Sequence, residues 1–408
     1  MKIRSITYFC NPGYPLDEKV LQKAGQFLSK AKSAFEAEGY EVQTTRLATI
    51  PFPQLLGNEN LGRLPELTSQ IDLIAQRLKV GYVSLGPALP ESPVSYEAIP
   101  DAMLVSRNVF FGGVMADKTR GIDLSAVRAC AEVITKCAFI EPNGFANLQF
   151  AALANVKPGS PFLPAAYHES DEPAFAIATE SADLAVQAFE TAKTVEQGRN
   201  ILIAEVTKHG QGIAQIAQSQ ISDPPSPRFL GIDFSLAPFP DDAHSLGNAV
   251  EQMGVPKIGM HGSLAAAAIL TEAVDRADFP HIGFSGFMQP VLEDAVFAKR
   301  AAEGTLTVKD MLLYSAVCGT GLDTIPLPGD TTTEQIIPLL LDICALALRL
   351  DKPLTARLMP IPGRKVGDET NFNFAYFAPS RVMALDSETL SGAFSRMDTF
   401  QLSSRTRT

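Results

Sequence analysis

The sequence contains few cysteines and lacks the short motifs that assign a chemistry by themselves. Its five cysteines form no closely spaced pair, which argues against a disulfide-bonded scaffold and favours a reducing compartment. No HxH, CxxC or HExxH spacing occurs, so a zinc site has no support. The patterns GxxxxGK[ST] and strand-linked GxGxxG are also missing, so the common nucleotide-binding loops have no support either.

Positive charge and long apolar runs are scarce as well. Lys and Arg total 34 against 45 Asp and Glu, giving a net charge of −11, and no basic stripe suited to nucleic acid is present. The N-terminal segment lacks the apolar stretch of a signal peptide. The apolar runs Leu264–Leu270 and Ile336–Leu350 are too short or too interrupted to span a bilayer. We therefore expect a cytoplasmic protein without nucleic-acid or membrane partners.

Apolar residues, by contrast, are abundant enough for a large core. The 408 residues are 46% hydrophobic and 19% charged, which fits a globular protein. Strand-like and helix-like segments alternate, which predicts a mostly parallel sheet or an α/β barrel with helices outside. We expect one domain over 1–408, and we interpret the proline-rich punctuation at 222–228 as a rigid loop rather than a domain boundary.

The expected elements follow from hydrophobic periodicity and from the residues that start and stop helices. The expected strands are Ile3–Phe9, Glu41–Arg46, Val80–Leu85, Val109–Val114, Ala174–Ala178, Phe229–Phe234 and Leu354–Met359. The expected helices are Leu21–Phe35, Ile71–Leu78, Leu124–Ala138, Ser181–Gln220 with a break near Gly198, Ser245–Met253, Ser263–Asp275 and Glu334–Leu350. The last of these could pack in the core or at the interface of a homo-oligomer.

The segment Cys318–Asp330 concentrates candidate site residues. It holds a thiol, two carboxylates (Asp323 and Asp330), three glycines and two prolines within thirteen residues. Because glycine and proline oppose regular helix, we expect a tight loop that exposes backbone N–H groups to a ligand. Cys318 is the candidate nucleophile, with Gly319, Thr320 and Gly321 as ligand contacts; the alternative is a buried cysteine packed as a small apolar residue.

A second group of candidates follows the predicted strand Phe229–Phe234. Asp233, Ser235 and His244 supply a carboxylate, a hydroxyl and an imidazole suited to acid/base chemistry. A carboxylate within an apolar strand must be paired or liganded, because unpaired burial costs several kcal/mol. A divalent cation held by Asp233, Asp323 and Asp330 is a further possibility.

Other candidates are polar residues on predicted loops and cations that could hold a carboxylate or phosphate. They are Asn147, Tyr167 and His168 in the loop 143–168, His261 before an alanine-rich helix, Arg107 ahead of a phenylalanine-rich strand, and Arg357 within an apolar strand. The arginines could equally form internal ion pairs, and a lone histidine is often structural.

Four stretches carry a resemblance to a known family. They are Asn147–His168, Phe229–Pro238, Gly283–Asp294 and Cys318–Asp330, and they resemble the uncharacterised family called domain of unknown function 711. The resemblance implies a fold similar to the ten-stranded barrel of pyruvate formate-lyase-like enzymes. It brings no established reaction, and glycyl-radical chemistry is not expected, because Ser380-Arg-Val-Met-Ala384 has alanine where the radical glycine would stand.

We expect an enzyme that acts on a small, polar, anionic metabolite inside an α/β barrel. In this hypothesis Cys318, Asp323 and Asp330 face Asp233, His244 or His168 across the cavity, and catalysis is acid/base or thiol-assisted, of lyase or hydrolase type. The alternative is a non-catalytic metabolite-binding or regulatory protein that uses the same cavity.

Overall fold

The structure, a computed structural model, describes residues 1–221 and 226–405. Its strands are β1 (Lys2–Cys10), β2 (Val42–Thr49), β3 (Tyr82–Ala88), β4 (Val109–Asp117), β5 (Gly121–Asp123), β6 (Phe150–Ala154), β7 (Ala174–Glu180), β8 (Arg228–Asp233), β9 (Gly321–Pro328), β10 (Leu354–Ile361) and β11 (Thr399–Phe400). Its α-helices are α1 (Glu18–Ala37), α2 (Phe52–Leu56), α3 (Leu64–Arg77), α4 (Val94–Met103), α5 (Leu124–Cys137), α6 (Ala182–Thr191), α7 (Val195–Ser219), α8 (Leu246–Gln252), α9 (Ser263–Asp275), α10 (Ala295–Ala302), α11 (Val308–Tyr314) and α12 (Thr333–Leu350). Short 3-10 helices cover Asn58–Arg63, Phe145–Gln149, Asp242–His244 and Gly392–Ser395. Most of the punctuation predicted at 222–228 lies outside the described residues.

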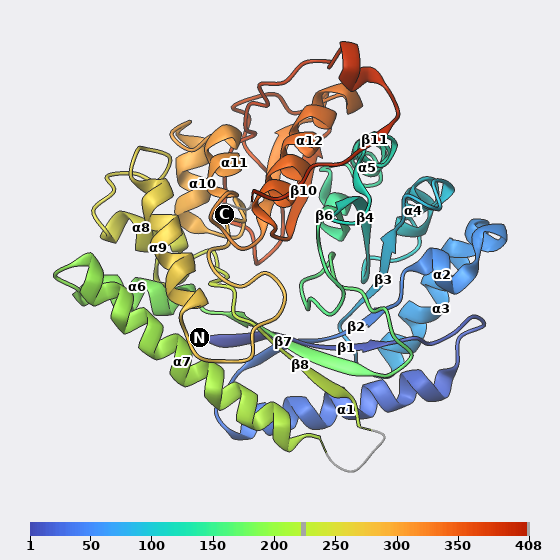
Figure 1. The fold of residues 1–408 in the computed structure, drawn as a ribbon, viewed down its shortest axis with the longest axis horizontal. Coiled ribbons are helices and arrows are strands. Elements are labelled where there is room, and N and C mark those ends of the chain that lie inside the picture. Colours follow the sequence, from blue (N-terminus) through green and yellow to red (C-terminus); the bar gives the residue numbers. More distant parts are fainter. Residues whose placement is uncertain (222–225, 406–408) are drawn as a thin grey trace.

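The strands form one large mixed sheet in the order β8-β7-β1-β2-β3-β4-β6-β10-β9, with β5 paired to β4 and β11 paired to β5. Most neighbours in this path are parallel; β1 with β7 and β6 with β10 are antiparallel. The strands curve around the middle of the molecule and the helices lie outside them (Figure 1). The predicted α/β class, with helices outside the sheet, is confirmed.

The two ends of this strand path are joined by the segment 281–290. Isolated bridges connect Ile232 to His281 and Ser235 to Gly286 beside β8, and connect Pro290 to Asp323 in β9. The segment is too irregular to form a continuous strand, and Ser285 within it has a left-handed backbone (φ 43°). Backbone pairing therefore continues from β8 to β9 through short contacts.

Helix α1 illustrates how local sequence produces these elements. Its buried residues recur at helical spacing (Leu21, Ala24, Leu28, Ala31 and Phe35) and face the sheet. The Asp17 carboxylate caps the N-terminus by accepting from the backbone N–H of Lys19 at 2.8 Å. The amphipathic pattern predicted for this segment is confirmed.

The segment Cys318–Asp330 is not the loop that its composition predicts. Residues Gly321–Pro328 form the buried strand β9, which pairs with β10. Pro326 and Pro328 fit there because, beyond the bridge of Asp323 to Pro290, β9 has no regular strand partner opposite β10 in the described part of the chain. Composition misled the prediction because glycine and proline are tolerated at the edge of a sheet.

The break in the predicted helix Ser181–Gln220 lies at a different position from the one that we predicted. It falls between α6 and α7 at residues 192–194, and Gly198 lies inside α7. A side chain at Gly198 would come within 2.5 Å of the Phe189 ring, so glycine is required by close helix packing rather than by a chain break. The elements β6, α4, α10 and α11 were not predicted.

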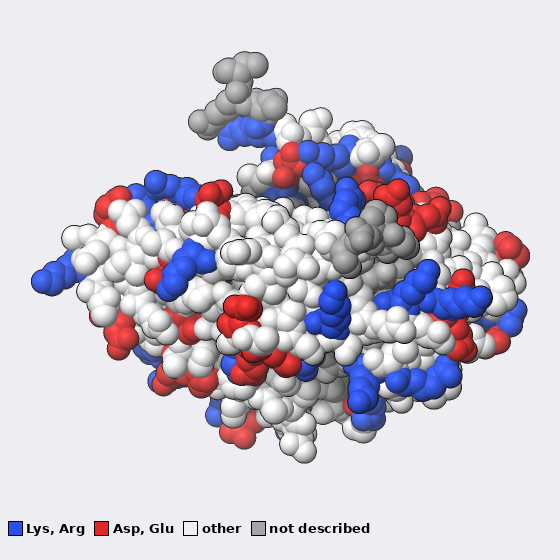
Figure 2. Space-filling view, turned by 90° about the horizontal axis from the view of Figure 1, so that it is seen from below, with Lys and Arg blue, Asp and Glu red and all other residues white. Residues whose placement is uncertain are grey.

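Charge is dispersed over the face shown in Figure 2, where acidic and basic side chains are interspersed around a broad uncharged band. Within residues 1–221 and 226–405, none of the helices combines the length and apolar character needed to cross a bilayer.

Candidate functional site

A network of buried ion pairs lies where β1, β9 and β10 face the segment that ends at Glu293. Arg357 Nε and Nη2 donate to the two oxygens of Asp323 at 2.5 and 3.0 Å, and Nη2 also donates to Glu293 Oε1 at 3.0 Å. Arg4 donates to the other Glu293 oxygen and lies 3.5 Å from Glu180. Two guanidinium groups therefore hold three carboxylates in the interior.

Irregular strand pairing places these side chains. The register of β1 against β7 shifts between Ile3 and Ser5, so Arg4 is the extra residue. The register of β9 against β10 shifts between Ala356 and Leu358, so that Asp323 and Thr324 together oppose Arg357. Thr324 takes a left-handed backbone (φ 44°), which is unfavourable for a β-branched residue. Such bulges redirect side chains and are over-represented next to active sites.

The network borders a cavity of about 90 Å³. The cavity is lined by Arg4, Gln43, Thr44, Arg46, Tyr82, Phe110, Leu148, Phe162, Leu163, Glu293, Arg357, Phe374 and Tyr376. We call this space the interior cavity. Three of its lining residues are arginines and one is acidic, and Glu180 and Asp323 pair with two of these arginines from behind the wall.

Arg46 differs from the other two arginines because it has no acidic partner in the described part of the chain. Its Nε donates to Thr44 Oγ1 at 2.9 Å, and its guanidinium lies 5.9 Å from the centre of the Tyr82 ring. Burial lowers the pKa of Arg46 to about 9, and the positive charge of Arg4 lowers it further in the same direction. The charge of Glu293 acts in the opposite direction from longer range, and no described carboxylate forms an ion pair with Arg46.

The carboxylates of the network differ in their proton affinity. Burial acts to raise the pKa of Glu293, but the guanidinium groups of Arg4 and Arg357 outweigh it and hold that pKa below its usual value. Burial raises the pKa of Glu180 above its usual value, although Arg4 and the Gln43 amide oppose the shift. Gln43 Nε2 donates to Glu180 Oε2 at 2.6 Å, while buried Oε1 has no hydrogen-bond partner in the described structure. Glu293 is thus the firmly ionised acid and Glu180 the one more easily protonated.

An aromatic segment near the C-terminus completes the wall. Phe374 and Tyr376 line the cavity, and Phe374 packs with Phe145 and Phe377 at ring-centre distances of 5.1 Å. Phe162 contributes from the loop before β7, with the Arg357 guanidinium 5.7 Å from its ring centre. The apolar side of the cavity is therefore built by loops together with Tyr82 of β3 and Phe110 of β4, and its charged side by strands and the segment ending at Glu293.

Residues 1–376 match the family model described as Uncharacterised ACR (DUF711). The chain belongs to this family. Similar proteins named UPF0210 occur in distant organisms: the one from Pyrobaculum islandicum is 31% identical over 368 residues, covering 85% of this chain and 79% of its own. The protein from Pyrobaculum aerophilum is 33% identical over 367 residues (84% and 79%), and that from Neisseria gonorrhoeae 28% over 377 residues (87% and 81%). The predicted family resemblance is confirmed.

Of the candidates predicted from sequence, the structure of this DUF711 member brings Asp323 and Arg357 together at the interior cavity. We expected Cys318, Asp323 and Asp330 to face Asp233, His244 or His168 across one cavity, but the interior cavity is lined by none of these six residues. No hydrogen bond or ion pair joins any two of these six residues in the structure, all six of which are described.

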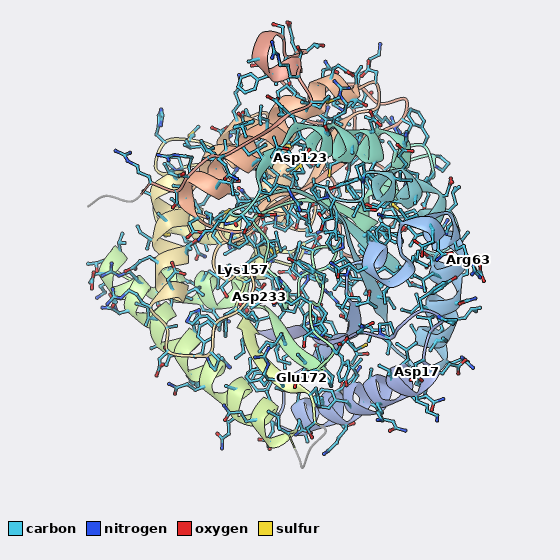
Figure 3. The ribbon with its side chains drawn as sticks, turned by 45° about the vertical axis from the view of Figure 1, so that its right-hand side comes forward. Asp17, Arg63, Asp123, Lys157, Glu172 and Asp233 are labelled. Carbon is cyan, nitrogen blue, oxygen red and sulfur yellow. The ribbon has the colours of Figure 1, made fainter. Side chains whose placement is uncertain are left out.

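Asp233 instead fastens the segment 281–290. It lies toward the middle of the molecule, whereas Asp17 and Arg63 lie at the periphery (Figure 3). Its carboxylate accepts from Phe284 N at 2.9 Å, from Ser285 N at 3.0 Å and from Ser235 Oγ at 2.6 Å. Asp233 is therefore satisfied by backbone and hydroxyl donors, which explains how it stays buried without a ligand.

Cys318 lines a different hollow, of about 410 Å³, together with Gly319, Ser285, Lys352 and others. Its side chain is buried, and its sulfur accepts from Gly321 N at 3.2 Å. The Thr320 hydroxyl is buried and points to no partner within the described residues, while its carbonyl accepts from Thr355 N at 2.8 Å. The residues 318–321 thus form the turn into β9, away from the interior cavity.

The remaining candidates have structural partners or are exposed. Asn147 Nδ2 donates to Ile134 O, Tyr167 donates to Val156 O, His168 Nε2 contacts Glu172 O, His244 contacts Asp241, and Arg107 pairs with Glu141. His261 and Asp330 are exposed. None of these seven residues lines the interior cavity.

The three carboxylates proposed for a divalent cation do not converge. Asp233 is bound by backbone donors, Asp323 by Arg357, and Asp330 is exposed. Within residues 1–221 and 226–405, no group of three or more His, Cys, Asp or Glu side chains has the arrangement of a metal site.

Sequence reasoning missed Arg4, Arg46, Glu180, Gln43 and the role of Glu293. The available signal was the one that singled out Arg357, namely a cation inside a predicted strand. Arg4 and Arg46 lie in the predicted strands Ile3–Phe9 and Glu41–Arg46, where they resembled the solvent-facing residues of a half-exposed strand.

Proposed function

We propose that this DUF711 member binds a small anionic metabolite in the interior cavity and acts on it by acid/base chemistry. One observation supports this most strongly: Arg46 presents a guanidinium to the cavity without a carboxylate partner. Arg46 is half-buried, and a partly desolvated cation of this kind is stabilised when an opposite charge joins it. A bound carboxylate or phosphate would supply that charge through paired hydrogen bonds.

Glu293 is the residue proposed to exchange a proton with the ligand. It is the one carboxylate on the cavity wall, and Arg4 and Arg357 hold it ionised and fixed in position. A fixed, ionised carboxylate within reach of a bound substrate can act as a general base, which fits a lyase or hydrolase type of reaction. Glu180, whose pKa is raised, is proposed as a proton reservoir behind Arg4 and Gln43. Thiol-assisted chemistry has less support, because Cys318 lines another hollow.

The fold proposed for this function is a barrel similar to that of pyruvate formate-lyase-like enzymes, without radical chemistry. The bridges of the segment 281–290 to β8 and β9 support ring closure. Location in the cytoplasm remains part of the proposal and is consistent with the five free cysteines.

A non-catalytic metabolite-binding protein is the second candidate. It is favoured by the observation that Glu293 and Asp323 are each tied to arginine, because ion pairing lowers the basicity of a carboxylate. In this case Arg46 would bind the same class of ligand, and Glu293 would only position Arg4 and Arg357.

The decisive measurement is anion binding by the purified full chain and two matched variants. Small molecules that co-purify would be identified by mass spectrometry, and a panel of carboxylates and phosphates would be ranked by thermal shift. We expect Arg46→Gln to reduce affinity for the bound anion at least tenfold, while Arg107→Gln, which changes an exposed arginine, leaves it within twofold. Without ligand, Arg46→Gln should be as stable as the natural protein, or more stable by about 1 kcal/mol, because an unpaired charge is removed.

Equal binding by all three proteins would refute the proposed site. Glu293→Gln then separates the two candidate functions once a ligand is known. Retained binding with loss of ligand turnover supports the enzyme, whereas an unchanged ligand recovered from all proteins supports a binding protein.

A further inference from the structure

We infer that the ligand of the interior cavity is a monocarboxylate of about six to nine non-hydrogen atoms in all, with an apolar or aromatic body. This inference rests on the proposed function and narrows its substrate class. Four features of the cavity carry it: the number of free donors, the placement of the acids, the nature of the opposite wall, and the volume.

The free donors suit one carboxylate. Arg357 uses Nε and Nη2 for Asp323 and Glu293, and Nη1 approaches Leu148 O at 3.5 Å. Arg46 uses only Nε, so both of its terminal nitrogens are free for a ligand within the described structure. Two adjacent guanidinium nitrogens match the two oxygens of one carboxylate.

The acids disfavour a second negative group. Glu293 lines the cavity and is ionised, and Asp323 stands behind it at Arg357. A second carboxylate, or the second charge of a phosphate, would have to approach Glu293 without a free cation to offset the repulsion. None of the thirteen lining residues belongs to the first turn of an α-helix, so the backbone donors that commonly bind phosphate are also missing from this wall.

The rest of the wall suits an apolar body. Seven lining residues are aromatic or aliphatic: Tyr82, Phe110, Leu148, Phe162, Leu163, Phe374 and Tyr376. Tyr82 and Phe110 meet edge to face at a ring-centre distance of 5.3 Å, close to Arg46. Burial of the methylene groups of a ligand against this wall is favourable, and a ligand ring could join this aromatic packing. A purely polar ligand would leave this surface without a matching partner.

The volume sets the size. About 90 Å³, at roughly 10–15 Å³ for each water-sized group, holds on the order of six to nine such groups. Benzoate and hexanoate fall within this range.

Titration calorimetry on the full chain tests the inference with benzoate, hexanoate, benzamide, succinate and inorganic phosphate. We expect benzoate or hexanoate to bind at least tenfold more tightly than succinate and phosphate. Benzamide, which has the shape of benzoate without its charge, should bind at least tenfold more weakly than benzoate. Arg46→Gln should abolish the preference of benzoate over benzamide.

A second variant tests the apolar wall. Phe374→Ala should weaken benzoate binding about fivefold and leave acetate binding unchanged, whereas Phe394→Ala, at an exposed phenylalanine, should change neither. Tighter binding of succinate or phosphate that still depends on Arg46 would overturn this inference and leave the proposed function standing. Absence of any Arg46-dependent anion binding would overturn both.

Discussion

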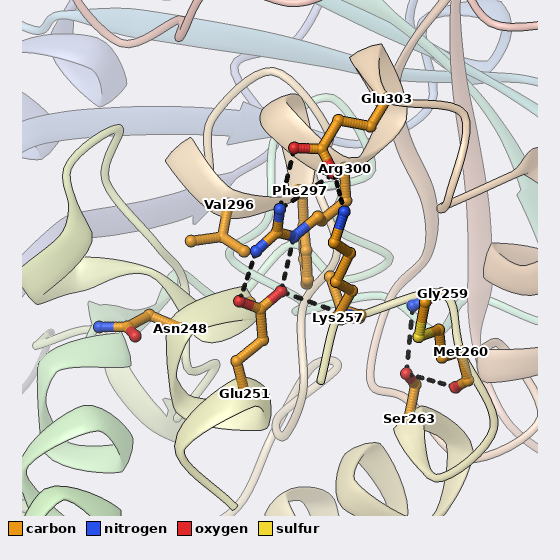
Figure 4. A network of polar contacts seen from close by, with 12 residues as sticks. Asn248, Glu251, Lys257, Gly259, Met260, Ser263, Val296, Phe297, Arg300 and Glu303 are labelled. Carbon is orange, nitrogen blue, oxygen red and sulfur yellow. Dashed lines mark hydrogen bonds and ion pairs between the residues drawn. The ribbon is translucent and has the colours of Figure 1, made fainter. Parts of the chain in front are cut away.

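The protein contains two arginine-centred ion networks that differ in how completely their charges are paired. In the first, between α8 and α10, Arg300 donates to both oxygens of Glu251 at 2.8 Å and to Glu303 at 2.9 and 3.0 Å, and Lys257 pairs with Glu303 at 2.9 Å (Figure 4). In the second, at the interior cavity, Arg4 and Arg357 are paired but Arg46 is not. Complete pairing is typical of a clamp between helices, whereas the unpaired Arg46 is the basis of the ligand site that we propose.

The two networks also differ in solvent access. The acids that hold Arg300, Glu251 and Glu303, are 19% and 33% exposed, whereas Glu293 and Asp323 beside Arg357 are 5% and 0% exposed. Water can replace a lost partner of Glu251 or Glu303, whereas Asp323 is fully buried and does not line the interior cavity. Removal of the central arginine should therefore lower the free energy of unfolding much more in the second network than in the first.

The largest expected effect comes from removing the central arginine of each network. Arg357→Met should lower the free energy of unfolding by about 3–5 kcal/mol, because Asp323 loses its partner while buried. Arg300→Met should lower it by about 1 kcal/mol, since its acids remain partly hydrated. Urea unfolding monitored by circular dichroism gives both values.

If Arg357→Met does not fold, the double variant Asp323→Leu with Arg357→Met provides the check. Removal of both charges should restore most of the stability, because no buried carboxylate is left without a partner. Equal losses for Arg357→Met and Arg300→Met would show that the two networks do not differ as described.

A change of pH is expected to have a smaller effect on the free energy of unfolding, with opposite signs for Glu293 and Glu180. The folded pKa of Glu293 lies below its unfolded value, so its stabilisation is present above that unfolded value and is lost as pH falls through the folded one. The folded pKa of Glu180 lies above its unfolded value, so its contribution decreases as pH rises from the unfolded to the folded value.

Relative to the natural protein, Glu293→Gln should therefore lose stability as pH is raised from 3.5 to 7, and Glu180→Gln should gain. The difference would be measured as the shift in urea midpoint at each pH. The same sign of change in both variants would contradict the assignment of Glu293 as the firmly ionised acid.

The smallest effect is expected from substitution of Cys318, which lines a different hollow from the interior cavity. Cys318→Ala should leave anion affinity within twofold, because its sulfur faces another hollow, and should cost about 1 kcal/mol of stability through the lost packing. A tenfold loss of anion affinity, measured by calorimetry, would instead link the two cavities and revive thiol-assisted chemistry.

The fold class was accessible from sequence because helical periodicity is local. The helix Ser263–Asp275 was predicted with the bounds that α9 has in the structure, and Leu354–Met359 lies within β10. Strand β9 was missed because glycine and proline oppose an isolated strand, and it is stabilised by pairing with β10 and by the bridge of Asp323 to Pro290. Tertiary pairing overrode local preference there.

Only part of the candidate site could be predicted from the sequence, for a related reason. Arg357 and Asp323 could be singled out because charges in apolar segments need partners, and the structure supplies each to the other. Their meeting with Arg4 and Glu293 depends on register shifts between β1 and β7 and between β9 and β10. Such shifts arise from the paired strands together and leave no periodic signal in either strand alone. Asp233 shows the converse: its need for partners was predicted, but backbone N–H groups meet it.

The hydrogen bond between Arg4 and Glu293 joins residues 289 positions apart in the chain, and this separation bears on how the protein folds. Contacts between distant segments close large loops of chain and form slowly. The first strand must therefore wait for the segment that ends at Glu293 before Arg4 acquires this counter-ion, whereas Arg357 and Asp323 are only 34 positions apart. Ligand binding should accordingly appear as one of the last events of refolding, after most of the helical signal has returned.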